Sequence, residues 1–247
     1  YPCFSPDGKK LYFTSRRKLP PGYPEGGDIR LWEVERNETG WGNPVPFDTT
    51  VAQGQEYAHS IAKNGTVFFS SPHSGGTSLN IKKSGKTDGG YTKPSLLPYS
   101  INSVGYEDGP CVAPDERFLI FESQRPEGME GSCDLYISFK NQAGHWSIPV
   151  NMGPKINSAS TERFARLSPD GKYLFFGSNR NQSIHNWGFD IFWIDARIID
   201  ELRSHESAQI FIEQPIGEEL MNALYRNDVE GSAGLLKQWL SKYSNSI

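Results

Sequence analysis

Four short runs of aromatic and branched residues recur along the chain at nearly equal intervals, each after a polar turn. The runs are Leu11-Tyr12-Phe13, Val67-Phe68-Phe69, Phe118-Leu119-Ile120-Phe121 and Tyr173-Leu174-Phe175-Phe176. Runs of this composition and length, bounded by turn residues, are typical of β-strands. The sequence therefore predicts a strand after each of four turns.

The four turns are copies of one another. Ser168-Pro169-Asp170-Gly171-Lys172 nearly repeats Ser5-Pro6-Asp7-Gly8-Lys9, and Ala113-Pro114-Asp115-Glu116 and Ala62-Lys63-Asn64-Gly65 are weaker versions. Proline presets φ, aspartate caps the local backbone, and glycine accepts positive φ, so each copy predicts an antiparallel hairpin. The turn positions 7, 64, 115 and 170 are 57, 51 and 55 residues apart. A unit of this length holds more than one hairpin.

The rest of each unit supplies two more strands. A piece containing serine and arginine and a loop follow the hairpin, and then an acidic residue starts a third strand at Asp28, Asp134 and Asp190. A fourth segment begins at Trp41, Tyr91 or Trp146 and contains proline, which favours an edge position. Four antiparallel strands per unit predict an all-β fold, a β-propeller of four-stranded blades.

The Ser-Pro-Asp-Gly turns, Ser-x-Arg pieces and Asp-Ile-x-x strands together resemble the PD40, or WD40-like, β-propeller repeat of TolB-like bacterial proteins. The resemblance covers roughly residues 1–197. It implies a bacterial propeller in the periplasm or outside the cell. Propellers host many unrelated functions, so the resemblance indicates the fold far better than the activity.

The two ends of the chain depart from the repeat. The sequence starts inside a first strand, and the fourth unit, from Glu162 to Asp195, lacks a fourth segment. We expect upstream strands to complete the propeller and to hold any export signal. Residues 198–247 turn helical, and Leu220, Leu224, Leu236, Trp239 and Leu240 are predicted to pack against protein. This tail is interpreted as a cap on the propeller or, alternatively, as a surface for self-association or a partner.

A glutamate stands eight residues before three of the turn positions, at Glu56, Glu107 and Glu162. First strands line the channel of a propeller, so these side chains are predicted to surround one channel mouth. They could form a carboxylate ring that binds a cation or a basic peptide. The favoured alternative is that each caps backbone N–H groups where the chain enters its blade, because a repeated residue usually serves the repeat.

His59 and Arg166 break the repeat on the first strands, where the other copies hold proline, alanine, cysteine or serine. Near the glutamates, they could bind an anionic or zwitterionic ligand. The alternative is a histidine hydrogen-bonded inside the barrel and an arginine paired with Glu162.

Three ion pairs are predicted at the bases of the loops between second and third strands. They are Arg17 with Asp28, Arg125 with Asp134, and Arg180 with Asp190. The second unit has lost both charges, which is what a mutual contact predicts. A guanidinium can hold a carboxylate with two parallel hydrogen bonds.

Charge and cysteine content exclude several classes of function. The net charge is −4 without a cluster of lysine and arginine, which argues against nucleic-acid binding. The sequence contains no run of about 18 apolar residues, so no membrane span is predicted. Cys3 and Cys111 hold equivalent positions two blades apart, beyond the ~7 Å that a disulfide bridges. No histidine pair has zinc-ligand spacing, so no metal or cofactor is expected.

Two common hydrolase signatures are missing from the sequence. It contains neither Gly-x-Ser-x-Gly nor His-Glu-x-x-His, the motifs of common serine and zinc hydrolases. The favoured function is a non-enzymatic scaffold that binds a protein or ligand at the channel mouth or loop face. The alternative is a hydrolase or lyase acting on carbohydrate or peptide there. Convergence of His59, Arg166 and the glutamates in one deep pocket would favour the enzyme.

Overall fold

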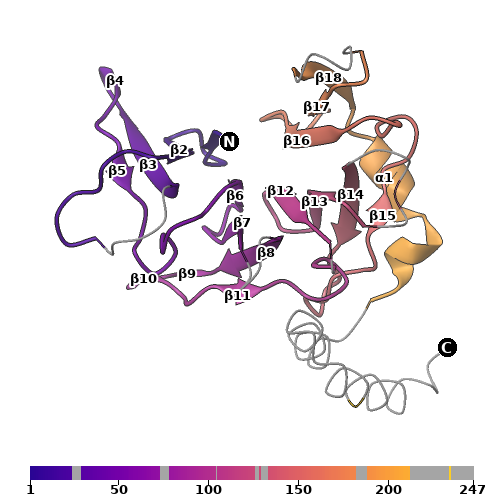
Figure 1. Ribbon diagram of the computed structural model, residues 1–247, viewed down its shortest axis with the longest axis horizontal. Coiled ribbons are helices and arrows are strands. Elements are labelled where there is room, and N and C mark those ends of the chain that lie inside the picture. The colour runs from indigo at the N-terminus through magenta and orange to yellow at the C-terminus, as the bar shows by residue number, and fades with distance from the viewer. Residues whose placement is uncertain are drawn as a thin grey trace.

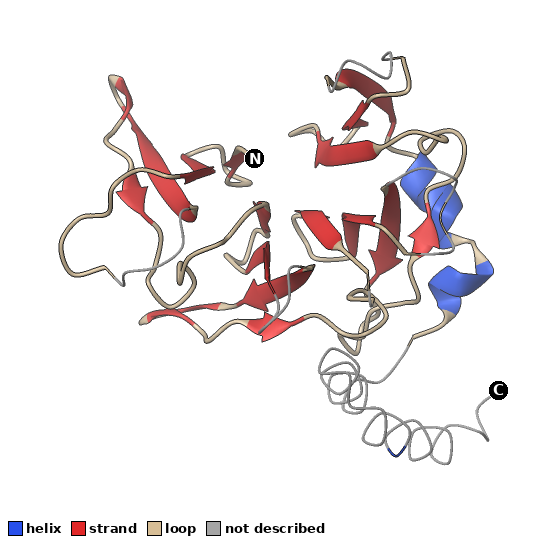
Figure 2. Cartoon of the chain, viewed as in Figure 1, coloured by secondary structure: helices blue, strands red, loops and turns tan. Residues whose placement is uncertain are grey.

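The computed structural model describes residues 1–23, 29–72, 78–103, 105–125, 128, 133–181, 188–211 and 234. Four antiparallel sheets follow one another along an arc, from the N-terminal sheet to the sheet of β16–β18 (Figure 1). Strands and loops make up nearly all of the described chain (Figure 2). The predicted β-propeller is therefore confirmed, with one sheet for each sequence repeat.

Each sheet is a blade, whose first strand lies at the centre of the arc. Blade 1 consists of β1 (Cys3–Phe4), β2 (Lys10–Ser15), β3 (Arg30–Asn37), β4 (Gly40–Trp41) and β5 (Val45–Pro46). Blade 2 consists of β6 (His59–Ile61), β7 (Val67–Pro72), β8 (Leu79–Ser84) and β11 (Ser95–Leu96), with a small hairpin of β9 (Lys86–Thr87) and β10 (Gly90–Tyr91). Blade 3 consists of β12 (Glu107–Val112), β13 (Phe118–Ser123), β14 (Asp134–Phe139) and β15 (Val150–Asn151). Blade 4 consists of β16 (Glu162–Leu167), β17 (Tyr173–Ser178) and β18 (Asp190–Asp195).

The turn before β17 shows why the repeated sequence forms a hairpin. The Ser168 hydroxyl donates to Asp170 Oδ1 at 2.6 Å and accepts from the Lys172 N–H at 3.1 Å. Gly171 adopts a φ of +69° and donates its N–H to Ser168 O at 2.9 Å. These local bonds fix the turn without help from the rest of the molecule.

Blade 3 is buried on both faces of its sheet. Phe118, Ile120 and Leu135 lie in one core with Leu174 and Phe176 of blade 4. On the opposite face, Leu119, Phe121 and Tyr136 lie in a second core. This core also contains Phe68 and Ile81 of blade 2. Two-sided burial explains why the sequence has continuous apolar runs here instead of alternating residues.

Two buried asparagines tie each crossover to the blade that it leaves. Asn157 accepts from Leu135 N–H and donates to Leu135 O, both at 2.9 Å. Asn102 makes the same two bonds to Ile81, at 2.8 and 2.9 Å. The asparagine side chain thus forms the two backbone hydrogen bonds that a neighbouring strand would otherwise form with one residue of the third strand.

After β18 the chain returns to the propeller as a short helix, α1 (Ile198–Arg203), followed by a 3-10 turn at Glu206–Gln209. Ile198, Ile199 and Ala208 are buried against the core that blades 3 and 4 share. Of the predicted helical tail, residues 198–247, the structure describes 198–211 and residue 234. The apolar residues predicted to pack against protein, Leu220, Leu224, Leu236, Trp239 and Leu240, lie outside the described residues. Within the described part of the chain, no helix is long and apolar enough to cross a membrane.

Candidate functional site

The first strands β1, β6, β12 and β16 lie next to one another at the centre of the arc, the arrangement that their equal offsets predict. Glu107 at the start of β12 pairs with Ser123 at the end of β13, and Glu162 likewise pairs with Ser178. The loops from second to third strands therefore leave from the end where first strands begin. We call this end the mouth. The repeated turns lie at the opposite end.

The two glutamates of blades 3 and 4 cap the chain where it enters each blade. Glu162 is fully buried and accepts from Ser158 N–H at 2.9 Å, Ser158 Oγ at 2.7 Å and Ser178 Oγ at 2.5 Å. Glu107 makes the equivalent bonds to Ser103 and Ser123. Of the two interpretations of the glutamates, these contacts support capping, because the oxygens point into the protein.

Glu56, the equivalent glutamate of blade 2, has fewer hydrogen-bond partners among the described residues than Glu107 and Glu162 have. Its Oε1 accepts from Gly54 N–H at 2.8 Å, and among the described residues Oε2 has no hydrogen-bond partner. The side chain is buried, and this desolvation raises its pKa to about 7.

Two arginines pair with these glutamates rather than with the predicted aspartates. Arg180 Nη2 lies 3.2 Å from Glu162 Oε1, and Arg125 Nη2 lies 3.8 Å from Glu107 Oε1. In the described part of the chain, the ion pairs of these arginines do not extend to Asp190 or Asp134. Glu107 and Glu162 are fully buried, so each requires a counter-charge inside the protein. Asp134 is also buried, and it accepts a hydrogen bond from Asn151 Nδ2 at 2.8 Å.

Only one member of the predicted ion pair in blade 1, Arg17, belongs to the described residues. Asp28 lies outside the described residues, and the Arg17 guanidinium lies 5.3 Å from the centroid of the Phe13 ring. Opposite Ser15 the sheet places Arg30, whereas Asp134 stands opposite Ser123 in blade 3. The third strand of blade 1 is thus shifted by two residues from the alignment that the sequence suggests.

His59 and Arg166 meet at the centre, but through the backbone. Arg166 Nη2 donates to His59 O at 3.2 Å, and Nη1 donates to Ala165 O at 2.7 Å and Pro110 O at 3.4 Å. His59 is fully buried, and burial together with the Arg166 charge lowers its pKa to about 3. Arg166 therefore links the first strands of blades 2, 3 and 4, and His59 is neutral at physiological pH.

A charged cluster that the sequence analysis missed lies at the mouth. Arg163 donates from Nε to Glu122 Oε2 at 2.5 Å and from Nη2 to Asp108 Oδ2 at 3.0 Å and Tyr106 Oη at 2.9 Å. The Tyr1 hydroxyl donates to Asp108 Oδ2 at 3.2 Å, and Ser70 donates to the other Asp108 oxygen. All four blades therefore contribute to this cluster.

Burial and the neighbouring Asp108 charge raise the pKa of Glu122 to about 7. The sequence does contain a signal for this residue. Glu122 directly follows the apolar run of β13, at the position where β17 has Gly177. A carboxylate at the end of a strand buried on both faces requires a partner, and Arg163 is that partner.

Bulges in β12 and β16 position the cluster. The register shifts between Asp108 and Cys111 and between Arg163 and Arg166. At the first bulge Gly109 has a φ of +59°, and a Cβ there would overlap the Glu122 carboxylate. At the second, Phe164 has a φ of +62° and donates its N–H to Glu122 Oε1 at 2.9 Å.

The unusual backbone at Phe164 turns its ring outward. The ring is 37% exposed and lies 5.3 Å from the Tyr1 ring and 5.2 Å from the Phe189 ring. The Arg163 guanidinium stacks on the same ring at 5.4 Å. Backbone in this region is costly for a non-glycine residue and is often found at functional positions.

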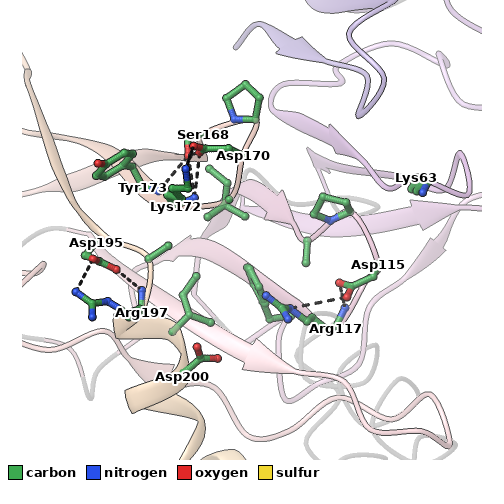
Figure 3. Close-up of a pocket in the computed structure, with 18 residues that line it drawn as sticks. Lys63, Asp115, Arg117, Ser168, Asp170, Lys172, Tyr173, Asp195, Arg197 and Asp200 are labelled. Atoms are coloured by element: carbon green, nitrogen blue, oxygen red, sulfur yellow. Dashed lines mark hydrogen bonds and ion pairs between the residues drawn. The ribbon is translucent and has the colours of Figure 1, made fainter.

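A groove of about 790 Å³ lies at the opposite end, between the turns of blades 3 and 4 and the start of α1 (Figure 3). Six of its charged side chains form local ion pairs, at 3.8 Å for Arg117 with Asp115, 3.2 Å for Lys172 with Asp170 and 2.8 Å for Arg197 with Asp195. These exposed pairs contribute little energy. The groove lining holds none of the five residues that the sequence predicted for ligand binding.

The described part of the chain contains no candidate metal site and no disulfide. No group of three histidine, cysteine, aspartate or glutamate side chains is placed there to hold a metal ion. Cys3, Cys111 and Cys133 are all free.

No protein-family model and no curated protein matches this chain. Solved structures do. A putative TolB from Agrobacterium tumefaciens is 19% identical over 78% of this chain and 57% of its own, with a TM-score of 0.48. An α-L-arabinofuranosidase from Lactobacillus brevis is 13% identical over 76% of this chain and 69% of its own, with a TM-score of 0.50. A periplasmic gluconolactonase from Pseudomonas aeruginosa is 14% identical over 79% of this chain and 56% of its own, with a TM-score of 0.43.

The similarity to these proteins is one of fold. The chain spans little more than half the length of the TolB and gluconolactonase structures. A shared propeller fold leaves the activity open, because sites differ among proteins of one fold.

The partner of Arg180 can be identified by two double-mutant cycles. We expect a coupling energy of roughly 2 kcal/mol between Arg180→Ala and Glu162→Gln, measured by urea unfolding, because each change leaves a buried group unpaired. The matched cycle of Arg180→Ala with Asp190→Ala should give additive losses. A larger coupling energy in the second cycle would restore the aspartate as the partner.

Glu56 should make stability fall as the pH rises. Its pKa is about 7 in the folded protein and ordinarily 4.5, so between these values the folded state keeps a proton that the unfolded state releases. Stability from this group is complete below about pH 4.5 and declines up to about pH 7, by roughly 1–3 kcal/mol. Urea midpoints of Glu56→Gln should decline less over this range than those of wild type, because only Glu122, whose pKa is also about 7, then contributes; Glu35→Gln, an exposed control, should decline as wild type does. Equal slopes for wild type and Glu56→Gln would refute the assignment.

Proposed function

We propose that this chain is a binding module that presents its mouth to a protein or small-molecule ligand and performs no catalysis. The observation that carries the proposal is the burial of its carboxylates. Glu56, Glu107, Asp108, Glu122 and Glu162 are each at most 2% exposed. Among the described residues of the charged cluster, Phe164 is 37% exposed and the Arg163 side chain is 25% exposed.

General acid–base catalysis requires a carboxyl group within hydrogen-bond reach of the substrate. Asp108 and Glu122 both bond Arg163, which lies between them and accounts for an oxygen of each. Freeing either carboxylate would leave a buried charge unpaired, at a cost of several kcal/mol. The cluster is therefore built to stay closed.

The exposed part of the mouth has the composition of a binding surface. Aromatic rings and arginine are the side chains most enriched among the residues that dominate binding energy. Phe164 is held by a backbone bond to Glu122 and by its ring neighbours, so little freedom is lost when it contacts a ligand. By resemblance to TolB-like proteins, we place this binding function in the periplasm or outside the cell.

The alternative is a hydrolase or lyase at the same mouth. Glu122, with a pKa of about 7, lies beside Asp108, and glycosidases use two carboxyl groups whose environments separate their pKa values. The similar Lactobacillus brevis protein is an arabinofuranosidase, so the fold admits such chemistry. Burial of Glu122 favours binding over this alternative.

Two measurements separate these functions. The purified chain and Glu122→Gln should both leave 4-nitrophenyl α-L-arabinofuranoside hydrolysing at the buffer rate, and turnover that Glu122→Gln abolishes would establish the enzyme instead. Peptides selected from a phage-displayed dodecapeptide library should bind Phe164→Ala at least tenfold more weakly than wild type. Phe4→Ala, which removes an exposed ring from blade 1, is the matched control. Equal binding by both variants would place the binding surface elsewhere.

A further inference from the structure

A glycine interrupts the second strand of blade 4 at a position where blades 2 and 3 carry a side chain. Gly177 lies inside β17 and pairs with Arg163, as Glu122 pairs with Asp108 in blade 3. Its φ lies outside the left-handed region, so the backbone does not require glycine here. A glycine within a strand weakens it and commonly marks a close approach by another group.

The group that approaches Gly177 is the ring of Phe164. A Cβ on Gly177 would lie 2.9 Å from Phe164 Cδ2, closer than two such atoms pack, and 3.5 Å from Phe189 Cβ. The ring therefore lies across the backbone of β17, in the space that a side chain on residue 177 would take.

The first-strand bulge residue and the second-strand residue beside it form a pair in each blade, which we call the bulge pair. In blade 3 the roles are exchanged, because the bulge residue is Gly109 and a Cβ there would overlap the Glu122 carboxylate. In blade 2 both positions are small, and the Ala58 N–H donates to the Ser70 hydroxyl at 3.1 Å. Each of these pairs thus has room for at most one large side chain.

The large member of the bulge pair decides what each blade contributes to the mouth. Glu122 extends to blade 4, where it accepts from Arg163 Nε and from the Phe164 N–H. Ser70 likewise extends to blade 3 and donates to Asp108. In blade 4 the second-strand position has no side chain to extend, and the aromatic ring from the first strand takes its place.

The backbone of Phe164 cannot move to relieve a contact with residue 177. Its N–H is bonded to the buried Glu122 carboxylate at 2.9 Å, and losing that bond would leave a buried acceptor short of a donor. A methyl group on residue 177 must therefore turn the ring itself. The ring would then leave its present neighbours, the rings of Tyr1 and Phe189 at 5.3 and 5.2 Å.

We propose that Gly177 is a positioning residue of the mouth. Because it has no side chain, the Phe164 ring lies against β17, and this placement fixes the aromatic surface that a ligand contacts. A ring held in its binding position loses little freedom when a ligand arrives, so displacing the ring weakens binding. This inference rests on the binding function proposed above, in which Phe164 contacts the ligand.

The dodecapeptides selected on wild type are the probe for this role. Gly177→Ala should weaken their binding at least tenfold, measured by calorimetry on protein whose circular dichroism spectrum matches that of wild type. In the Phe164→Ala background the same change should have no further effect, because no ring is left to displace. Gly89→Ala is the matched control and should bind as wild type does, since a Cβ on Gly89 meets nothing within 4 Å.

The position of the ring can also be followed without a ligand. With para-fluorophenylalanine in place of Phe164, Gly177→Ala should shift the fluorine NMR resonance, whereas Gly89→Ala should not. An unshifted resonance would overturn the inference. So would unchanged peptide affinity in Gly177→Ala while Phe164→Ala weakens binding, a result that leaves the proposed function standing. Unchanged affinity in Phe164→Ala as well would overturn both.

Discussion

Each blade of this propeller carries apolar side chains on both faces of its sheet, so it is stable only where another layer covers each face. Blade 3 meets this requirement, with one core shared with blade 2 and another with blade 4. A third core joins blade 1 to blade 2, and burial of apolar surface in these interfaces stabilises the arc. Among the described residues, blade 4 is covered on one face only, and Phe175 and Trp193 on its other face are exposed.

The polar groups at the centre follow from the same constraint. Where four first strands meet, water is excluded, so each charge there must find a partner inside the protein. Glu162 has Arg180, and Asp108 and Glu122 share Arg163. The Glu162 pair lies within blade 4, whereas the two Arg163 pairs connect blade 4 to blade 3. Among the described residues of the charged cluster, Arg163 and Phe164 keep exposed area.

Much of the fold could be predicted from sequence because its signals are local. The Ser-Pro-Asp-Gly turn is stabilised by bonds among its own residues, and its four copies mark the four blades that the structure describes. The positions of Glu107 and Glu162 at the start of first strands followed from counting back from that turn. Their capping role also followed, since a residue that recurs with the blade contacts parts of the blade that recur.

The site was less predictable because it depends on contacts between strands. Arg180 pairs with Glu162 through the register of β16 with β17, whereas the sequence places Asp190 at the nearer end of the next strand. Arg163 and Glu122 meet because bulges at Phe164 and Gly109 rotate two first strands, and nothing in the alternation of residues marks a bulge. The two-residue shift of β3, which places Arg30 opposite Ser15, also could not be predicted, because it depends on the register between two strands.

Amide hydrogen exchange tests the two-sided burial of blades most directly, because Leu135 and Ile191 occupy the same position in blades 3 and 4. The Leu135 N–H is bonded to Asn157 inside two packed layers, so we expect it to exchange only with global unfolding. The Ile191 N–H faces the open edge and should exchange orders of magnitude faster. Equal protection of the two amides would contradict the account, since it would mean that blade 4 is as fully covered as blade 3.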